Sequence, residues 1–167
     1  ALYPVDDEAA ATQLLDSPAA QALGLFAVEY ALAQLWQAWR VRPVAALGHS
    51  TGEYAIATLA GVMTLDTAVN VLGTMGQLLA KLPPGKLLAV AMPSERLRQQ
   101  LDDSLSLAAI NAPNACVVSG PPLPMAALAE QLTAMRVSTQ WLPVQRALHS
   151  PAVESVAAAL RGVLADG

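Results

Sequence analysis

The residues best suited to chemistry lie in the stretch AALGHSTGEYAIA, residues 45–57, where a histidine and a serine stand between two glycines. The run Gly48-His49-Ser50-Thr51-Gly52 fits G-x-S-x-G, the pattern of a nucleophile elbow. Such an elbow needs a strand that ends at the first glycine, a strained turn that exposes the serine hydroxyl, and a helix directly behind it. Flanking glycines keep side chains from colliding in so sharp a turn, and backbone N–H groups at the helix N-terminus can stabilise an oxyanion. The pattern predicts Ser50 as the nucleophile and the Thr51 N–H as an oxyanion-hole donor.

A serine nucleophile needs a base, and histidine is the usual base near neutral pH. The chain has only two histidines. His49 adjoins the serine, and because successive side chains at a turn point apart, it is poorly placed to take the hydroxyl proton. His149 lies in a predicted loop before a helix, where an inserted subdomain would leave it facing Ser50. The pattern alone leaves two plainer interpretations open: an ordinary strand-to-helix turn at Ser50 and a surface or capping role for His149.

The elements that must position these residues differ between the two parts of the chain. Up to about Pro84 the pattern predicts an α/β arrangement in which Ser17 and Thr64 cap helices and Val44 to Gly48 form a short strand buried on both faces. The helices are expected over residues 18–40, 51–60 and 64–82.

After Gly85 the pattern changes to a βαββαβ order, which is that of a ferredoxin-like sandwich. The expected elements are the strands KLLAVAM, LSLAAIN, ACVVSG and VSTQWLPV and the helices PSERLRQQLDD and PMAALAEQLTAM. Beyond them, a Ser150 cap and Pro151 predict a last helix. The predicted fold class is α/β: a partial α/β-hydrolase-like core over residues 17–84 and 145–167, a ferredoxin-like subdomain over 85–144, and a loop or linker over 1–16.

Composition limits the possible partners. Charged residues make up only 13% of the chain and hydrophobic residues 54%, so part of this surface is expected to be covered. No basic cluster is present to bind nucleic acid, and no His, Cys, Asp or Glu cluster has metal-ligand spacing. The acidic N-terminus does not fit an export signal, no stretch is favoured as a membrane span, and the single Cys116 suits a reducing compartment as a buried structural thiol. We expect a cytoplasmic protein.

Four blocks in order carry a resemblance: GHSTGEYAIATLAGVMTLDTAV, PPGKLLAV, AAINAPNACVVSGP and ALHSPAVE. They resemble the acyltransferase domains of modular type I polyketide synthases and the related malonyl-CoA:acyl carrier protein transacylases. The resemblance covers nearly all of the chain after Ala20. It implies that Ser50 is acylated by an acyl-CoA, that His149 is the base, and that the inserted ferredoxin-like subdomain lies between them in sequence.

The resemblance also implies the partners and the absence of a cofactor. The acyl group would pass to the phosphopantetheine thiol of an acyl carrier protein, with a ketosynthase and a linker as neighbouring domains. Acyl-CoA would be a substrate, and no metal or bound organic cofactor is implied. Glu53 lies on the helix that runs away from Ser50, so we expect a first-turn dipole partner or a structural salt bridge and not a triad acid. His49 would at most orient the site.

The chain departs from the family pattern at three places. No Gly-Gln-Gly loop, which supplies the second oxyanion donor, precedes the elbow, and the family's long segment after the histidine block is not present, so we expect part of a larger domain. Where malonyl-selective members carry an arginine for the substrate carboxylate, this chain has Met75, which favours a neutral acyl group. Arg146, just before the histidine, could supply charge from another direction.

Two alternatives stay open at this stage. The same dyad would make an acyl hydrolase if water replaced the carrier thiol. A chain without the second oxyanion donor could instead be a catalytically silent scaffold or docking element of a megasynthase.

Overall fold

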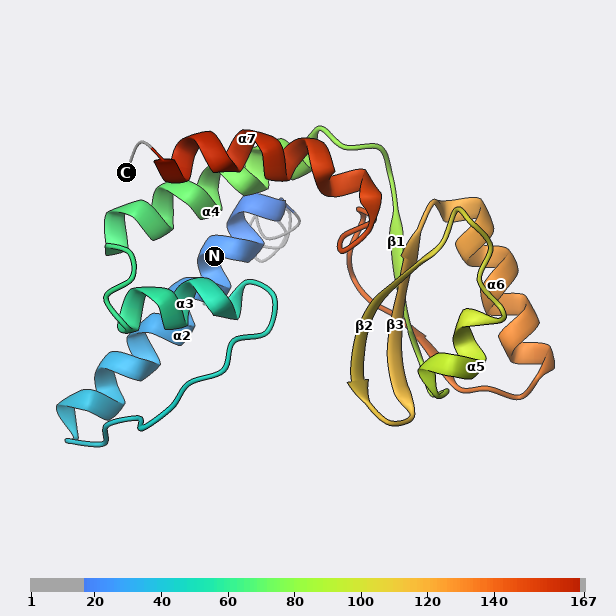
Figure 1. Ribbon diagram of the computed structural model, residues 1–167, viewed down its shortest axis with the longest axis horizontal. Coiled ribbons are helices and arrows are strands. Elements are labelled where there is room, and N and C mark those ends of the chain that lie inside the picture. The colour runs from blue at the N-terminus through green and yellow to red at the C-terminus, as the bar shows by residue number, and fades with distance from the viewer. Residues whose placement is uncertain (1–16, 166–167) are drawn as a thin grey trace, which may run out of the picture. The chain divides into compact units, whose positions relative to one another are not determined.

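The computed structural model describes residues 17–165 and forms two compact units (Figure 1). Within the described residues, the first unit contains residues 17–80 and 159–165, and the second contains residues 81–158. The domain boundaries expected from the sequence, after residues 84 and 144, stay a prediction. The linker expected over residues 1–16 lies outside the described residues.

Within the described residues, the first unit contains the helices α2 (Pro18–Ala38), α3 (Gly52–Leu59) and α4 (Leu65–Ala80), together with the C-terminal part of α7 (Glu154–Ala165). The predicted caps are confirmed, because the Ser17 hydroxyl accepts the Ala20 N–H at 3.1 Å and the Thr64 hydroxyl accepts the Thr67 N–H at 3.1 Å. Gly61 ends the turn after α3 with a φ of 73°, a conformation that costs glycine little.

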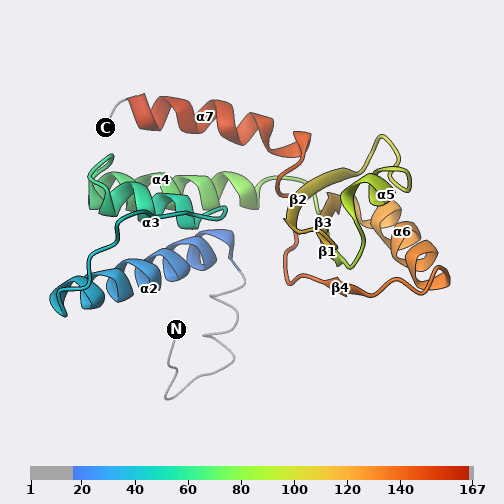
Figure 2. The ribbon, with the colours of Figure 1, turned by 60° about the horizontal axis from the view of Figure 1, so that its bottom comes forward.

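The helices α2, α3 and α4 pack on one another (Figure 2): α2 lies along α4, and α3 contacts both. Five buried residues form their shared core: Ala22, Phe26, Ala55, Ala68 and Leu72. A glycine permits the closest approach, since a Cβ added at Gly76 would overlap the backbone of Ala19 on α2.

The strand expected over residues 44–48 is not formed, so that prediction is wrong for this chain. The segment contains no hydrogen-bonded strand, and the side chains of Val44 and Leu47 are 105% and 96% exposed. A strand exists only through its ladder bonds to a neighbour. Within residues 17–165, no other strand pairs with this segment. The α/β-hydrolase-like core therefore stays a prediction.

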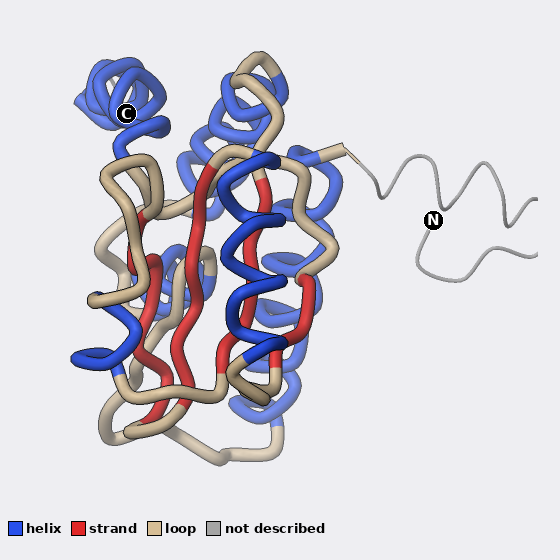
Figure 3. Tube along the Cα trace, turned by 90° about the vertical axis from the view of Figure 1, so that its right-hand side faces the viewer, coloured by secondary structure: helices blue, strands red, loops and turns tan. Residues whose placement is uncertain are grey.

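The second unit is a four-stranded antiparallel sheet with helices on one face (Figure 3). Its strands are β1 (Lys86–Val90), β2 (Ser106–Ala112), β3 (Ala115–Gly120) and β4 (Thr139–Trp141), and its helices are α5 (Ser94–Arg98) and α6 (Pro122–Ala134). The spatial order β2-β3-β1-β4 and the chain order βαββαβ together confirm the predicted ferredoxin-like subdomain. The helix predicted over residues 93–103 and the strand over 137–144 are shorter than expected, at five and three residues.

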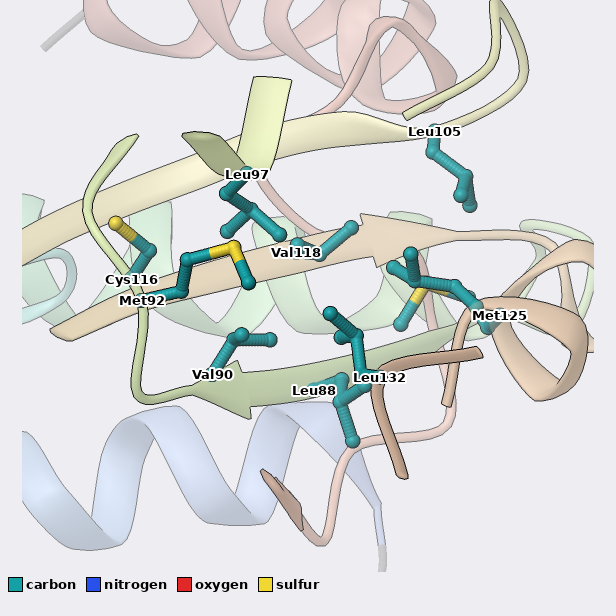
Figure 4. Packing of buried hydrophobic residues seen from close by; sticks show 10 residues of the cluster. Leu88, Val90, Met92, Leu97, Leu105, Cys116, Val118, Met125 and Leu132 are labelled. Carbon is teal, nitrogen blue, oxygen red and sulfur yellow. The ribbon is translucent and has the colours of Figure 1, made fainter. Parts of the chain in front are cut away.

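The core of this unit lies between the sheet and its helices (Figure 4). On the strands, Leu88, Val90, Cys116 and Val118 point toward the helices, as the two-residue period of a strand requires. From the helices, Leu97 of α5 and Met125 and Leu132 of α6 meet them, and all three are fully buried. The predicted buried position of Cys116 is confirmed, at 2% exposure.

The chain enters and leaves this sheet at one place. Pro84, just before β1, forms an isolated antiparallel bridge with Arg146, and the Gly85 N–H donates to the Gln145 carbonyl at 3.0 Å. After this point come the short 3-10 helix η1 (Pro151–Val153) and α7 (Glu154–Ala165). The predicted Ser150 cap is confirmed, because its hydroxyl accepts the Ala152 N–H at 3.3 Å.

Candidate acyltransferase site

The Ser50 turn in the first unit shows two of the three features expected of a nucleophile elbow, the strained turn and the helix behind it, while the strand before it is not formed. Ser50 has a φ of 54°, in the left-handed region that non-glycine residues rarely occupy, and it is exposed. Behind it the chain closes at once into α3. The N–H groups of Gly52, Glu53 and Tyr54 donate to the carbonyls of residues 49, 50 and 51 at 3.0, 3.2 and 3.1 Å. The serine thus stands at the tip of a tight turn in front of a helix N-terminus.

The two glycines of the elbow differ in their surroundings. A Cβ added at Gly48 would lie 2.5 Å from both the backbone nitrogen and Cα of Glu53, so only glycine fits there. A Cβ added at Gly52 would instead meet Glu29 Oε1 at 3.5 Å, an ordinary contact distance. The expectation that both glycines are sterically required is therefore confirmed for Gly48 and wrong for Gly52 within the described residues.

The Thr51 amide lies at the N-cap of α3. Within residues 17–165, this N–H donates to no backbone carbonyl, although the next three amides of the turn all do. It points from the N-terminal end of α3, where the helix dipole favours negative charge. Glu53 lies in the first turn of the same helix and is exposed, as its expected role of dipole partner requires.

Glu29 on α2 is a neighbour of the elbow that the sequence did not single out. Its Oε2 is buried and has no hydrogen-bond partner within the described residues, and its carboxylate faces Gly52. An acidic residue in the middle of an apolar helix was the only available signal, and a single sequence does not say which element it will face.

The His149 loop, residues 145–150 of the second unit, is held on its N-terminal side by the segment before β1. Besides the Gly85 hydrogen bond to Gln145, the Lys86 ammonium donates to the Gln145 side-chain oxygen at 2.9 Å. A Cβ added at Gly85 would overlap the backbone of Ala147, so the two segments touch through a glycine. This contact of Gly85 with the His149 loop was not predicted, although Gly85 lies in the block PPGKLLAV.

His149 itself is exposed and has a φ of 54°, the same left-handed conformation as Ser50. On its C-terminal side, the Ser150 hydroxyl donates to the Ala147 carbonyl at 2.6 Å and accepts the Ala152 N–H. The loop therefore presents the imidazole from a backbone that is fixed before and after it. Because Ser50 and His149 belong to different units, their meeting as a dyad stays a prediction.

The remaining predicted site residues fall in both units. His49 is exposed beside Ser50, and Met75 on α4 is half-buried against the helical core of the first unit. Arg146 is half-buried in the His149 loop, where its guanidinium donates to the Gln145 carbonyl at 2.9 Å. The structure therefore brings together His49, Ser50 and Thr51 in one turn and Arg146 with His149 in one loop.

Among residues 17–165 no group of three His, Cys, Asp or Glu side chains is arranged to hold a metal ion. In the same part of the chain, no helix is both long and apolar enough to cross a bilayer. Burial, with a smaller contribution from the Glu95 carboxylate, raises the pKa of the Cys116 thiol above its usual value. Cys116 is accordingly a packing residue and not a nucleophile.

Comparison with known proteins shows the family of the chain. Residues 7–167 match the family described as Acyl transferase domain. One subunit of the phenolphthiocerol/phthiocerol polyketide synthase of Mycobacterium tuberculosis is 40% identical over 130 residues, which are 78% of this chain and 9% of that protein. The pikromycin polyketide synthase component PikAII of Streptomyces venezuelae is 40% identical over 144 residues, 84% of this chain and 4% of that protein.

Solved structures give the same result. The acyltransferase domain from the second module of the salinomycin polyketide synthase superposes with a TM-score of 0.84 at 35% identity, covering 89% of this chain and 36% of that one. A loading acyltransferase from the avermectin modular polyketide synthase gives 0.84 at 34% identity, covering 90% and 50%.

The chain belongs to the acyl transferase domain family. Within that family it is of the modular type I polyketide synthase kind, which confirms the resemblance seen in the four sequence blocks. It spans less than a tenth of the two polyketide synthases compared above and about a third to a half of the two matched structures.

Proposed function

We propose that this chain carries the catalytic dyad of a polyketide synthase acyltransferase, with Ser50 as nucleophile and His149 as base. The observation that carries the proposal is the left-handed backbone of Ser50, at the tip of a turn whose following amide, that of Thr51, has no backbone acceptor among residues 17–165. A strained, exposed serine in front of a helix N-terminus suits nucleophilic attack and oxyanion stabilisation. Membership of the acyl transferase family supports the same chemistry.

The first half-reaction loads the serine. The His149 imidazole takes the proton of the Ser50 hydroxyl as the oxygen attacks the thioester carbonyl of an acyl-CoA, and the Thr51 N–H donates to the resulting oxyanion. The tetrahedral intermediate collapses, the carbon–sulfur bond breaks, and the imidazolium returns its proton to the coenzyme A sulfur. The products are an acyl ester on Ser50 and free coenzyme A.

The second half-reaction unloads the serine onto a carrier. The phosphopantetheine thiol of an acyl carrier protein loses its proton to His149 and attacks the ester carbonyl. The ester carbon–oxygen bond breaks, and the imidazolium protonates the Ser50 oxygen. The acyl carrier protein and the neighbouring ketosynthase and linker domains are thus the expected partners, and the reaction needs no metal or bound cofactor.

We propose a neutral acyl group as the substrate because Met75 offers no positive charge to a malonyl-type carboxylate. Its thioether is half-buried against the apolar helix core, and a carboxylate placed in apolar surroundings without a charged partner is strongly disfavoured. The matched relatives do not decide this point, since one is a loading acyltransferase and another comes from an internal module, at nearly equal identity.

The test is to incubate the full-length protein that carries this chain with a panel of acyl-CoA thioesters and measure the mass of the Ser50 peptide. An adduct that persists and passes to acyl carrier protein supports transfer, and its loss in Ser50→Ala and His149→Ala variants assigns the dyad. Rapid release of free acid would indicate a hydrolase, and no adduct with any thioester would indicate a silent scaffold. Preferential loading of malonyl-CoA would contradict the role given to Met75.

A further inference from the structure

The Ser150 hydroxyl bridges the backbone on both sides of His149. It donates to the Ala147 carbonyl, two residues before the histidine, at 2.6 Å, and it accepts the Ala152 N–H, three residues after, at 3.3 Å. Between these two bonds lies the left-handed His149. We propose that Ser150 is a positioning residue, which holds the base in its working orientation; this rests on the proposed role of His149.

The conformation of His149 explains why such a bridge is needed. A side chain with a Cβ meets the following carbonyl when φ is near +54°, so a free loop would relax toward negative φ. That rotation would swing the imidazole away from its position, because the Cα–Cβ bond turns with the backbone. The Ser150 hydroxyl opposes the rotation by fixing the carbonyl before the histidine and the amide after it.

Ser150 is well suited to this task by its own conformation. It is half-buried and lies in the extended region, with φ −133° and ψ 170°, so its side chain reaches back over the turn without strain. The Ala147 carbonyl that it binds belongs to the residue already held against Gly85. The Ser150 hydroxyl therefore connects Ala147, which is held against Gly85 before the histidine, to Ala152 in η1 after it.

If Ser150 were only a helix cap, it would make the same two hydrogen bonds, but its removal would have a different effect from that of removing a positioning residue. Loss of a cap lowers stability and leaves the rate of the folded protein unchanged. Loss of a positioning residue lowers the rate through the histidine, and only when the histidine is present. The two roles therefore separate in a double-mutant cycle.

The experiment measures single-turnover acylation of Ser50 in the full-length protein, at saturating and limiting acyl-CoA. Ser150→Ala is compared with the wild type, with His149→Ala and with the double variant. Ser104→Ala, a serine-to-alanine change in the same unit that removes a hydrogen bond to Asp102 and none in the His149 loop, is the matched control. Ser150→Thr keeps the hydroxyl, suits the extended backbone and is expected to restore most of the rate. Thermal melting of each variant checks that it is folded.

We expect Ser150→Ala to lower the acylation rate at saturation by about 10- to 100-fold in the wild-type background, since small misplacements of a catalytic group cost that much. In the His149→Ala background the same change lowers the residual rate by less than about twofold, and KM for acyl-CoA stays within about twofold of the wild type. If Ser150→Ala does not fold, Ser150→Cys, which retains size but is a weak donor, takes its place in the cycle.

Four results would overturn the proposal. Unchanged acylation in Ser150→Ala removes the positioning role and leaves the proposed function intact. An equal loss in both backgrounds assigns Ser150 a role that does not pass through the histidine. Wild-type protein that forms no Ser50 adduct, or a His149→Ala variant as fast as the wild type, removes the proposed function and this inference with it.

Discussion

At the scale of single residues, the two groups assigned to catalysis share a backbone conformation. Ser50 and His149 both have a φ of 54°, where each residue with a Cβ costs roughly 1–2 kcal/mol relative to the right-handed region. Strain of this kind persists only where the surroundings fix it. At Ser50 the surroundings are the close packing of Gly48 on Glu53, and at His149 they are the Gly85 contact and the Ser150 bonds.

The first prediction concerns the two elbow glycines. Gly48→Ala is expected to lower Ser50 acylation by at least about 100-fold, because the new methyl group displaces the turn that aims the hydroxyl. Gly52→Ala, which adds the same methyl group at an ordinary contact distance, is the matched control and is expected to lose less than about tenfold. Mass measurement of the acylated peptide gives both rates. Equal losses in the two variants would contradict the steric argument.

The second prediction concerns the acyl group. Met75→Arg places a guanidinium where the chain now has a thioether, and we expect the ratio of malonyl to neutral acyl loading to rise by about 10-fold or more, through a charge-assisted pair. Met75→Leu conserves the volume and adds no charge, so its loading ratio serves as the control. Competition between two acyl-CoA thioesters, resolved by mass, measures the ratio. An equal change of the malonyl-to-neutral loading ratio in Met75→Arg and Met75→Leu would show that the effect comes from packing and not from charge.

Much of the residue chemistry was predictable, and some of it was not. The G-x-S-x-G spacing predicts the strained serine because the pattern implies a particular turn. Nothing in ALHSPAVE predicts a left-handed His149, and the contacts that hold its loop are made with Gly85 and Lys86, which are distant in sequence. The second bond of Ser150 was missed for the same reason: its acceptor, the Ala147 carbonyl, is placed by Gly85.

At the scale of elements, α2 and α4 are held together by a contact that only glycine allows. Gly76 is buried against the α2 backbone at Ala19, whereas a Cβ added at Gly24, on α2 itself, would meet no atom of residues 17–165 within 4 Å. A glycine-to-alanine substitution should therefore change the free energy of unfolding in opposite directions at these two positions.

The third prediction follows from this contrast. Gly76→Ala is expected to destabilise the protein by about 1–3 kcal/mol, since the methyl group forces two packed helices apart. Gly24→Ala is expected to stabilise it by up to about 1 kcal/mol, since alanine favours the helix and meets nothing. Thermal unfolding followed by circular dichroism measures both. A stabilising Gly76→Ala would show that the helices are not in contact there.

Element type was predicted correctly where the signal was local, and incorrectly where it was not. Caps at Ser17, Thr64 and Ser150 and the period-two strands of the second unit depend on residues close in sequence. The segment 44–48 is apolar enough for a central strand, but a strand requires neighbours. In residues 17–165 it remains extended and unpaired, with Val44 and Leu47 exposed.

At the scale of the whole molecule, the two units differ in how completely they enclose their apolar surface. The second unit buries a ten-residue core between sheet and helices. In the first unit one stripe of α2 and its C-cap Trp39 stays exposed. Its members follow helical spacing: Leu25, Val28, Leu32, Leu35, Trp36 and Trp39. The two tryptophans stack edge to face at 5.5 Å on this stripe. The low fraction of charged residues, 13% of the chain, is thus accompanied by an exposed apolar surface on α2.

The fourth prediction is that residues 81–158 fold on their own. Their core is complete within the segment, so we expect cooperative unfolding and a Cys116 thiol that resists alkylation until denaturant is added. Burial, which raises the pKa of this thiol, keeps the reactive thiolate scarce in the folded state. Iodoacetamide labelling against urea concentration makes the measurement. Labelling at the same rate with and without urea would contradict it.

The bridge between Pro84 and Arg146 brings the two ends of the sandwich together. Because the ends of this segment are already adjacent, a homologous segment from a related synthase can replace it without moving the flanking residues apart. The entropy cost of bringing the two ends together is met by pairing within the inserted sheet. Chimeras with crossover points at 84 and 146 should therefore tolerate a foreign sandwich, while crossovers inside the strands would leave ladder bonds unmatched. Positions 84 and 146 are therefore natural boundaries for exchanging this subdomain.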